Sequence, residues 1–404
     1  MTPTTRKTLQ FVIIILCVAA AISVGWSLYN YARTESTSSK SSPPANVRNP
    51  TLASSRITKL LNRTDAPPPT ITGNFPCVFA TVAESDSAPQ LGECASPIAS
   101  TGPVDRFEVD LRYGNFIMRQ TDLYLSDGFD APLTRSYNSG DYIHPNHIHA
   151  FGKNTNHPFD ISPVGTRNPY TYQAIILEDG NFVFSSRVSD GVGFADAIYQ
   201  QVESGNKFYK AVTAWNGDGW TTWLADGSAI VFPEAYSSTN MAQGAPTEMV
   251  DSAGNHLTLI RDAQRNLQEI QTPHKYKIKF RYDTVSRIVH VEDDSSHSVN
   301  YLYNADGMLT DANSSSGRQR HYSYAGILMT QIEDENHHVL LRNSYSGNFL
   351  ASQDFGNGRV YSYEYTDSPD GGYAQSALVT LPDGNKVSVE LTTSVPDFIK
   401  HRPQ

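Results

Sequence analysis

The feature that most constrains the fold is a repeat with a period of 21 residues. One arginine and five tyrosines mark the starts of successive copies: Arg261, Tyr282, Tyr303, Tyr324, Tyr345 and Tyr365. The last interval is 20 residues and the others are 21. A fixed period of about 20 to 50 residues is the signature of a repeat architecture. The stretch from 261 to 365 therefore predicts stacked copies of one small unit.

Each copy contains two strand patterns separated by a turn. Ile278-Lys-Phe-Arg-Tyr282 alternates apolar and polar residues, which is typical of a strand with one buried face. Asn304-Ala-Asp-Gly307 has the composition of a tight turn, and a second apolar strand follows it from Leu309. A lone hairpin is marginal in water, whereas stacked hairpins bury a shared face. The repeats thus predict an open, curling antiparallel sheet.

Two stretches resemble a known family. Tyr282-Asp283, followed by Arg287-Ile288, resembles the YD repeats of the RHS family. The segment 102–139, with Gly114-Asn115 and the ending Arg135-Ser-Tyr-Asn-Ser139, is similar to the domain that introduces those repeats. The resemblance implies a β-rich introductory domain and a repeat scaffold. In the toxin members an Asp-Pro-Xaa-Gly cleavage region and a toxin follow the repeats. This chain has about five copies and no such element, so we expect the scaffold without toxin delivery.

The N-terminal region predicts a membrane segment. Residues 8–32 carry no charge, which is long enough for a transmembrane helix of about 20 apolar residues. Arg6 and Lys7 precede this segment and predict a cytoplasmic N-terminus. A signal-anchor helix is favoured over a cleaved signal peptide, for which Ala19-Ala20-Ala21 supplies small residues. Either way the bulk of the chain is expected outside the cytoplasm, periplasmic or extracellular, at a bacterial inner membrane.

Composition divides the chain into four predicted regions. Residues 1–33 form the cytoplasmic tip and the membrane helix, and residues 34–104 form a Ser- and Pro-rich linker. Residues 105–250 form the introductory β domain and residues 251–404 the YD repeats. Within the linker, Ser54 to Asn62 suggests a short helix. Cys77 and Cys94 are expected to pair as a disulfide in an oxidising compartment, with a reactive thiol as the alternative.

Two clusters are candidates for ligand binding. His144, His147 and His149 lie in a polar loop with a spacing compatible with a transition metal, although solvated histidines are the simpler interpretation. Trp220 and Trp223 offer flat faces for stacking a sugar, against the alternative of core packing.

The arrangement of four tyrosines discriminates between sugar binding and packing between sheets: Tyr322, Tyr324, Tyr361 and Tyr363. An exposed stripe of alternate tyrosines would favour glycan binding, and interlocked tyrosines would oppose it.

The net charge and the absence of several catalytic motifs exclude some classes of function. The net charge of -10 argues against a nucleic-acid partner. The sequence lacks a Gly-Xaa-Ser-Xaa-Gly elbow, a phosphate-binding glycine loop and a metalloprotease histidine pair. Acidic pairs such as Asp293-Asp294 sit in return turns, where turn formation explains them better than glycosidase chemistry. We therefore expect no enzyme and no cofactor.

These observations predict a non-enzymatic scaffold or interaction protein of the cell envelope. Free sheet edges would receive a strand from another envelope protein or an RHS-type polypeptide. Binding of a cell-wall or capsular carbohydrate is the alternative, and a glycosidase-like hydrolase is the third hypothesis.

Overall fold

The computed structural model describes residues 78–83, 90–93, 105–140, 148–201, 207–235, 241–367 and 374–390. Within these ranges the chain forms β-strands and two short 3-10 helices, η3 (Pro158–Asp160) and η4 (Met241–Gly244), without an α-helix. The predicted all-β fold is confirmed for this part of the chain. No helix in it is long and apolar enough to cross a membrane. The membrane helix predicted over residues 8–32 lies outside the described residues.

Six strands form one sheet, which we call the inner sheet, in the order β2-β1-β3-β4-β5-β6. Its strands are β1 (Val78–Ala83), β2 (Gln90–Glu93), β3 (Asp105–Asp110), β4 (Asn115–Asp127), β5 (Phe129–Asn138) and β6 (Thr155–Asn156). The long hairpin of β4 and β5 turns at Gly128, whose φ of 74° favours glycine. The first seven residues of β4 are buried without alternation. Protein therefore covers both faces of this sheet.

All later strands form a second sheet, which we call the wall. Its first strands are β7 (Ser162–Gly165), β8 (Tyr172–Ile176), β9 (Phe182–Arg187), β10 (Ile198–Gln200), β11 (Val212–Trp215), β12 (Gly219–Trp223), β13 (Ala229–Pro233) and β14 (Glu248–Val250). Each strand pairs antiparallel with the next in the chain. Pairing continues from β14 into the first repeat strand. The domain boundary predicted at residue 250 falls inside this continuous sheet and stays a prediction.

The repeats supply the rest of the wall. Their strands are β15 (His256–Arg261), β16 (Leu267–Gln271), β17 (Lys277–Tyr282), β18 (Ile288–Asp293), β19 (Ser298–Tyr303), β20 (Leu309–Ser314), β21 (Gln319–Ala325), β22 (Leu328–Glu333), β23 (Val339–Ser346), β24 (Phe349–Asp354), β25 (Val360–Asp367), β26 (Ala374–Thr380) and β27 (Lys386–Glu390). Antiparallel registers join every neighbouring pair in chain order. The predicted antiparallel hairpins are thus confirmed.

The wall differs from the open sheet that the repeats predict. Its strand order returns from β27 to β7 and closes on itself. The registers of the described residues run from β7 to β27, and none of them pairs β27 with β7. The prediction counted only the copies from 261 to 365. In the structure, β7 to β14 extend the same sheet before the first copy.

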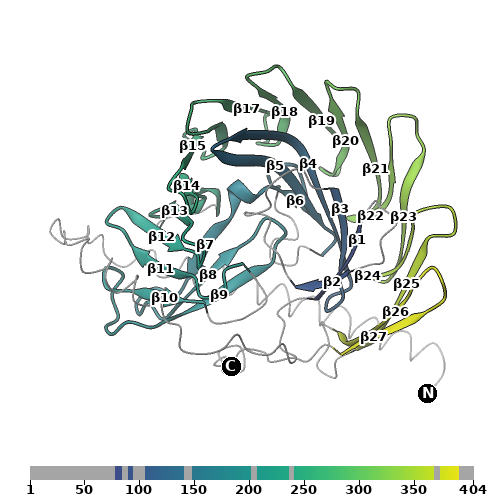
Figure 1. The fold of residues 1–404 in the computed structure, drawn as a ribbon, viewed down its shortest axis with the longest axis horizontal. Helices are drawn as coiled ribbons and strands as arrows, with labels where there is room; N and C mark the ends of the chain where they lie inside the picture. The colour runs from purple at the N-terminus through teal and green to yellow at the C-terminus, as the bar shows by residue number, and fades with distance from the viewer. Residues whose placement is uncertain are drawn as a thin grey trace. The chain divides into compact units, whose positions relative to one another are not determined.

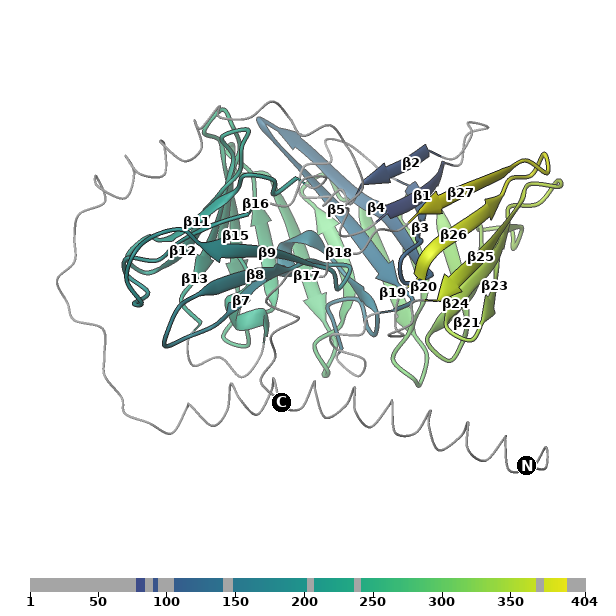
Figure 2. The same cartoon turned by 90° about the horizontal axis from the view of Figure 1, so that it is seen from below.

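The inner sheet lies against the concave side of the wall. Figure 1 shows β3, β4 and β5 inside the arc formed by β15 to β27. Figure 2 shows the same strands between the teal part of the wall and its yellow-green part. One core joins both sheets: it includes Phe116 and Tyr137 of the inner sheet with Tyr301, Met329 and Leu350 of the wall. The repeat strands bury the apolar side of their alternation here, because this side faces the inner sheet.

Candidate functional site: the tyrosine ladder and the anchors of the inner sheet

The marker tyrosines form a ladder of hydrogen bonds along the wall. The hydroxyl of Tyr303 donates to the carbonyl oxygen of Ile288 at 2.5 Å, and that of Tyr324 donates to Leu309 at 2.7 Å. The rungs before and after them are Tyr282 to Leu267 at 2.9 Å and Tyr345 to Met329 at 2.8 Å. Each acceptor is the first or second residue of the second strand of the preceding copy. The period of the sequence is therefore the period of a physical contact between copies.

A β-bulge positions each marker residue. The register shifts immediately before each of the first five markers, at 260/261, 281/282, 302/303, 323/324 and 344/345. A bulge adds one residue to a strand and re-aims its side chain. The marker residue consequently leaves the regular strand alternation and reaches the neighbouring copy.

The first marker is an arginine because it contacts a different structure. No copy precedes Arg261, and its guanidinium instead bonds Asp160 Oδ1 at 2.8 Å and the carbonyl oxygen of Phe159, both in η3. It also donates to the carbonyl oxygen of Pro246 at 3.1 Å. The side chain is 2% exposed. Arg261 thus attaches the first copy to the segment that leads into the wall.

The last marker, Tyr365, does not continue the ladder of hydrogen bonds. The hydroxyl of Tyr365 is buried and has no hydrogen-bond partner among the residues that the structure describes. The register shift in this copy falls later, between Thr366 and Asp367, so no bulge re-aims the tyrosine. Its ring packs against Phe349 at 5.2 Å between centroids. The ladder therefore ends at Tyr345.

Arg135 anchors the inner sheet to the repeats. This side chain of β5 is 1% exposed and donates to both carboxylate oxygens of Asp122, at 2.5 and 3.0 Å. It also donates to the hydroxyl oxygen of Tyr322 at 3.0 Å, and Tyr301 donates to Asp122 at 2.6 Å. The guanidinium lies 5.5 to 5.9 Å from the ring centroids of Tyr301, Tyr322 and Phe151. Two strands of the inner sheet and two of the wall thus share one buried charge network.

Backbone contacts complete the docking. Leu350 N donates to Gly114 O at 2.8 Å and Ala374 N donates to Arg112 O at 2.6 Å. Near the other end, Lys153 N donates to Gly307 O at 2.9 Å. Gly152 has φ of 86°, and a Cβ at this position would lie 2.4 Å from Gly307 O. The approach of the two backbones requires glycine there.

A second buried cluster surrounds Arg119 of β4. Its guanidinium donates to Glu108 at 2.9 Å, Glu178 at 3.0 Å and Asp179 at 2.6 Å. These four side chains are at most 7% exposed. Burial, with the charge of Asp179 adding to it, raises the pKa of Glu178 to about 7. Burial likewise raises the pKa of Asp110 to about 7. The ion pairs of Arg119 join β3 and β4 to the turn after β8.

One cavity of about 680 Å³ opens between the inner sheet and the wall. Phe107 of β3 and Phe355 pack at 5.9 Å between ring centroids and form its apolar side. Charged residues from three wall turns form the other side: Arg318, Asp334, Glu335 and Arg359. A concave surface with aromatic groups and a few polar ones is the usual form of a ligand site.

The structure separates the two tryptophans proposed to stack a sugar. Trp220 is 7% exposed and belongs to the main core. Trp223 is half-buried and packs on a separate cluster of Ile198, Val212 and Ala214. Because they stand three residues apart on one strand, the two rings face opposite sides of the wall. They do not form one platform.

The four discriminating tyrosines are enclosed. Tyr322, Tyr361 and Tyr363 are each 4% exposed. Tyr324 is half-buried against the core and its hydroxyl is a rung of the ladder. They form no exposed stripe, which weighs against a tyrosine surface for glycans.

The remaining candidates lie mostly outside the described residues. This applies to His144, His147, Cys77 and Cys94. His149 is half-buried and pairs with Gly152 in a short bridge. In the ranges that the structure describes, no group of three or more His, Cys, Asp or Glu is arranged to hold a metal ion. The metal and disulfide predictions stay predictions.

Sequence reasoning missed both arginine anchors. Arg119 contacts Glu178 and Asp179 across 59 and 60 positions, and Arg135 contacts Tyr322 across 187. No local pattern marks such pairs. The one available signal was charge inside strands whose neighbours are apolar, as in Phe107-Glu-Val-Asp110, because buried charges are retained where they are paired.

Comparison with known proteins gives a short family match. A family model described as a domain of unknown function (DUF6531) matches residues 108–181. This range holds Glu108, Arg119, Arg135, Glu178 and Asp179. No curated protein matches the chain.

Several solved structures resemble the chain weakly. They include a crystal structure of TcdB2-TccC3 without its hypervariable C-terminal region, at 13% identity and a TM-score of 0.29, covering 70% of this chain and 16% of that one. TcdB2-TccC3-TEV matches at 14% identity and a TM-score of 0.28, covering 77% and 15%. A Photorhabdus luminescens Tc holotoxin pore with a TccC3 variant matches at 13% and 0.27, covering 70% and 15%. The chain spans at most 16% of the length of these matched chains.

Proposed function

We propose that this chain is a short RHS/YD-repeat protein that acts as a non-enzymatic scaffold of the cell envelope. The observation that carries the proposal is the tyrosine ladder: equivalent hydroxyls bond equivalent carbonyl oxygens in successive copies, each after a β-bulge. A wall assembled by repetition supports an extended binding surface. The buried anchors show that this wall holds another β-sheet on its concave side.

The buried charges support a scaffold over a hydrolase. A glycosidase needs two carboxyl groups about 5 to 10 Å apart on either side of a substrate. In the Arg119 cluster the guanidinium occupies the space among Glu108, Glu178 and Asp179. These groups are covered by protein, which supports a structural role for them.

The proposed partner is another envelope protein, and we assign its contact to the 680 Å³ cavity. Contact through an edge of the wall, as the sequence predicts, stays a second route, because no register of the described residues pairs β27 with β7. The cavity combines Phe107 and Phe355 with guanidinium and carboxylate groups from the wall turns. An extended polypeptide segment with an apolar and an acidic residue suits that lining.

Capture from intact cells tests the partner. The full chain, tagged at its C-terminus, is crosslinked and purified alongside an Arg318→Glu variant at the cavity and a Lys386→Glu control in β27. Each variant reverses one exposed positive charge, so loss of one stoichiometric protein in the first variant alone supports the cavity. Equal recovery from both variants removes the cavity from the proposal. Recovery of polysaccharide fragments and no protein favours the carbohydrate alternative.

The proposed location is the outer side of the inner membrane, with residues 8–32 as the anchor. Support comes from the uncharged length of this segment and the preceding Arg6 and Lys7. Protease added to spheroplasts should digest the wall while sparing cytoplasmic markers, and carbonate washing should leave the chain in the membrane. Release by carbonate would contradict the anchor.

A further inference from the structure

Two histidines from successive copies stack on the side of the wall that faces away from the core. The rings of His321 and His337 lie 4.7 Å apart between centroids, with their planes 21° apart. His321 is on β21 next to Tyr322, which packs in the core, so the His321 side chain points to the opposite side. His337 lies in the turn between β22 and β23. The stacked pair therefore joins the copy that starts at Tyr303 to the copy that starts at Tyr324.

A carboxylate holds one nitrogen of each ring. Asp311 is the cross-strand partner of His321, and its Oδ1 lies 2.6 Å from His321 Nδ1. Glu333 is the cross-strand partner on the other side, and its Oε2 lies 3.2 Å from His337 Nδ1. A carboxylate only accepts hydrogen bonds, so Nδ1 carries the proton and Nε2 keeps its lone pair. Among the described residues neither Nε2 atom has a hydrogen-bond partner. Both rings thus have the tautomer of metal-bound histidines.

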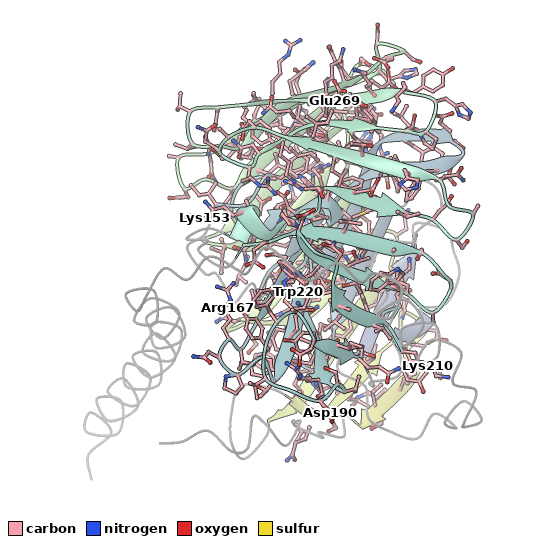
Figure 3. All side chains as sticks on the ribbon, turned by 90° about the vertical axis from the view of Figure 1, so that its left-hand side faces the viewer. Lys153, Arg167, Asp190, Lys210, Trp220 and Glu269 are labelled. Carbon is pink, nitrogen blue, oxygen red and sulfur yellow. The ribbon has the colours of Figure 1, made fainter. Side chains whose placement is uncertain are left out.

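The repeat itself does not require this arrangement. Two copies earlier, Glu269 and Lys279 occupy the cross-strand positions that correspond to Asp311 and His321. Figure 3 labels Glu269 among the side chains of the first copies. There the carboxylate forms an ordinary ion pair, with Lys277 Nζ 2.9 Å from Glu269 Oε1. The exchange of lysine for histidine replaces a cation with a group that can bind one.

The turn brings the second ring to the first. His337 has a φ of 60°, and the corresponding positions of two preceding turns hold Ser296 and Gly317, also at positive φ. In all three turns this residue donates its N–H to the carbonyl oxygen three residues earlier, at 3.0 to 3.1 Å. The left-handed conformation disfavours most residues with a β-carbon. A histidine in this conformation places its ring over His321, which serine and glycine at the same position have no ring to do.

Two imidazoles with carboxylates behind them suit a divalent transition-metal ion such as Zn²⁺, Ni²⁺ or Cu²⁺. Zinc binds nitrogen at about 2.0 to 2.1 Å with tetrahedral geometry, so one ion holds two Nε2 atoms about 3.3 Å apart. The ion lies in the plane of each ring, and one ring must therefore turn out of the stack. The side chain of His337 is 70% exposed and can turn, whereas that of His321 is 24% exposed and stays in place.

We propose that Nε2 of His321 and Nε2 of His337 bind one divalent transition-metal ion on the outward side of the wall. Asp311 and Glu333 position the two rings through Nδ1. The pair supplies two ligands and leaves the other positions of the ion to water or to a side chain of a bound molecule. The ion clamps two successive copies on the side opposite the tyrosine ladder. This inference does not depend on the partner proposed above.

Modification of histidines by diethyl pyrocarbonate tests the site in the full chain in detergent micelles. The reagent attacks the unprotonated ring nitrogen, which a bound ion covers, and peptide mass spectrometry reads each histidine separately. Zn²⁺ should protect His321 and His337 together. His338 is the internal reference, because it lies in the same turn, its Nδ1 is 3.3 Å from Asp334 Oδ2 and its side chain is 76% exposed. Its reactivity should not change with Zn²⁺.

Three variants separate a shared site from single histidines. His337→Asn keeps a residue that tolerates positive φ and should abolish the protection of His321, whereas the matched control His338→Asn should leave it intact. Asp311→Asn removes the carboxylate behind His321 and should weaken Zn²⁺ binding about 10- to 100-fold. Protection of His321 that survives in His337→Asn overturns the proposal. Equal protection by Mg²⁺, which prefers oxygen ligands to imidazole, overturns it as well.

Discussion

The tyrosine ladder predicts that removing the hydroxyl group of Tyr303 and removing that of Tyr365 change the stability of the chain differently. Tyr303→Phe removes the donor to Ile288 O and leaves the ring in place beside the Arg287 guanidinium, 4.4 Å from its centroid. The net worth of a buried hydrogen bond is about 1 kcal/mol, and an acceptor left without its partner brings the loss to about 1 to 3 kcal/mol. We expect the free energy of unfolding to fall by that amount.

Tyr365→Phe is the matched control because it removes the same atom from the last marker. This hydroxyl is buried and has no hydrogen-bond partner in the described part of the chain, so the folded state already bears its desolvation cost. Its removal should leave the free energy of unfolding unchanged or raise it by up to about 1 kcal/mol. The two substitutions are identical in chemistry and opposite in expected sign.

Urea unfolding of the full chain, followed by far-UV circular dichroism, measures both effects. A change in midpoint with an unchanged slope reports a change in stability. Hydrogen exchange of the β18 amides localises the effect to the affected copy. An equal loss in both variants would refute the reasoning, because it would show that the rings and not the hydroxyls join the copies.

Three further predictions concern the inner sheet. Gly152→Ala should lower the free energy of unfolding by at least about 2 kcal/mol, because the new Cβ would lie 2.4 Å from a backbone oxygen. The control is Gly254→Ala, at a φ of 84° with nothing within 4 Å of the new Cβ, which should cost about 1 kcal/mol in the same denaturation assay. Arg135→Met should cost about 3 to 5 kcal/mol because Asp122 would remain buried without its partner, and a loss below 1 kcal/mol would argue that the pair is not buried in solution. Burial raises the pKa of Glu178 in the folded chain from 4.5 to about 7, so the original chain loses stability as the pH rises through this window. The stability of the Glu178→Gln variant relative to the original chain should therefore increase by up to about 3 kcal/mol between pH 4.5 and 7. A stability difference that does not change with pH would contradict the raised pKa.

The hairpins were predictable because their chemistry is local. In each of the first three copies the turn after the marker places one residue at positive φ, namely Arg265, Ser286 and Gly307. The Asp or Asn after the marker accepts backbone hydrogen bonds within the same turn, as Asp283 and Asn304 do. Such turns are encoded within five residues. The period of 21 follows from repeating them.

The docking of the inner sheet was not predictable by these means. The first seven residues of strand β4 are all buried, because protein covers both faces of the strand. A sequence pattern for a hairpin with one buried face does not indicate this second cover. The rungs of the ladder also escaped prediction: Tyr303 reads as the end of a strand, and only the bulge before it shows that its hydroxyl reaches Ile288. The tryptophan pair failed as a platform because its odd spacing divides the rings between two faces.

The backbone contacts of the inner sheet imply an order of assembly. Gly114 and Arg112 precede their wall partners Leu350 and Ala374 by more than 230 positions. A ribosome therefore releases the inner sheet long before the strands that close over it, and domains fold in the order they emerge. Loops of such length are slow to close unless a surface captures each new segment. The inner sheet is that surface, a template on which successive hairpins wind, so damage to it should trap the chain with its repeats formed but unwound.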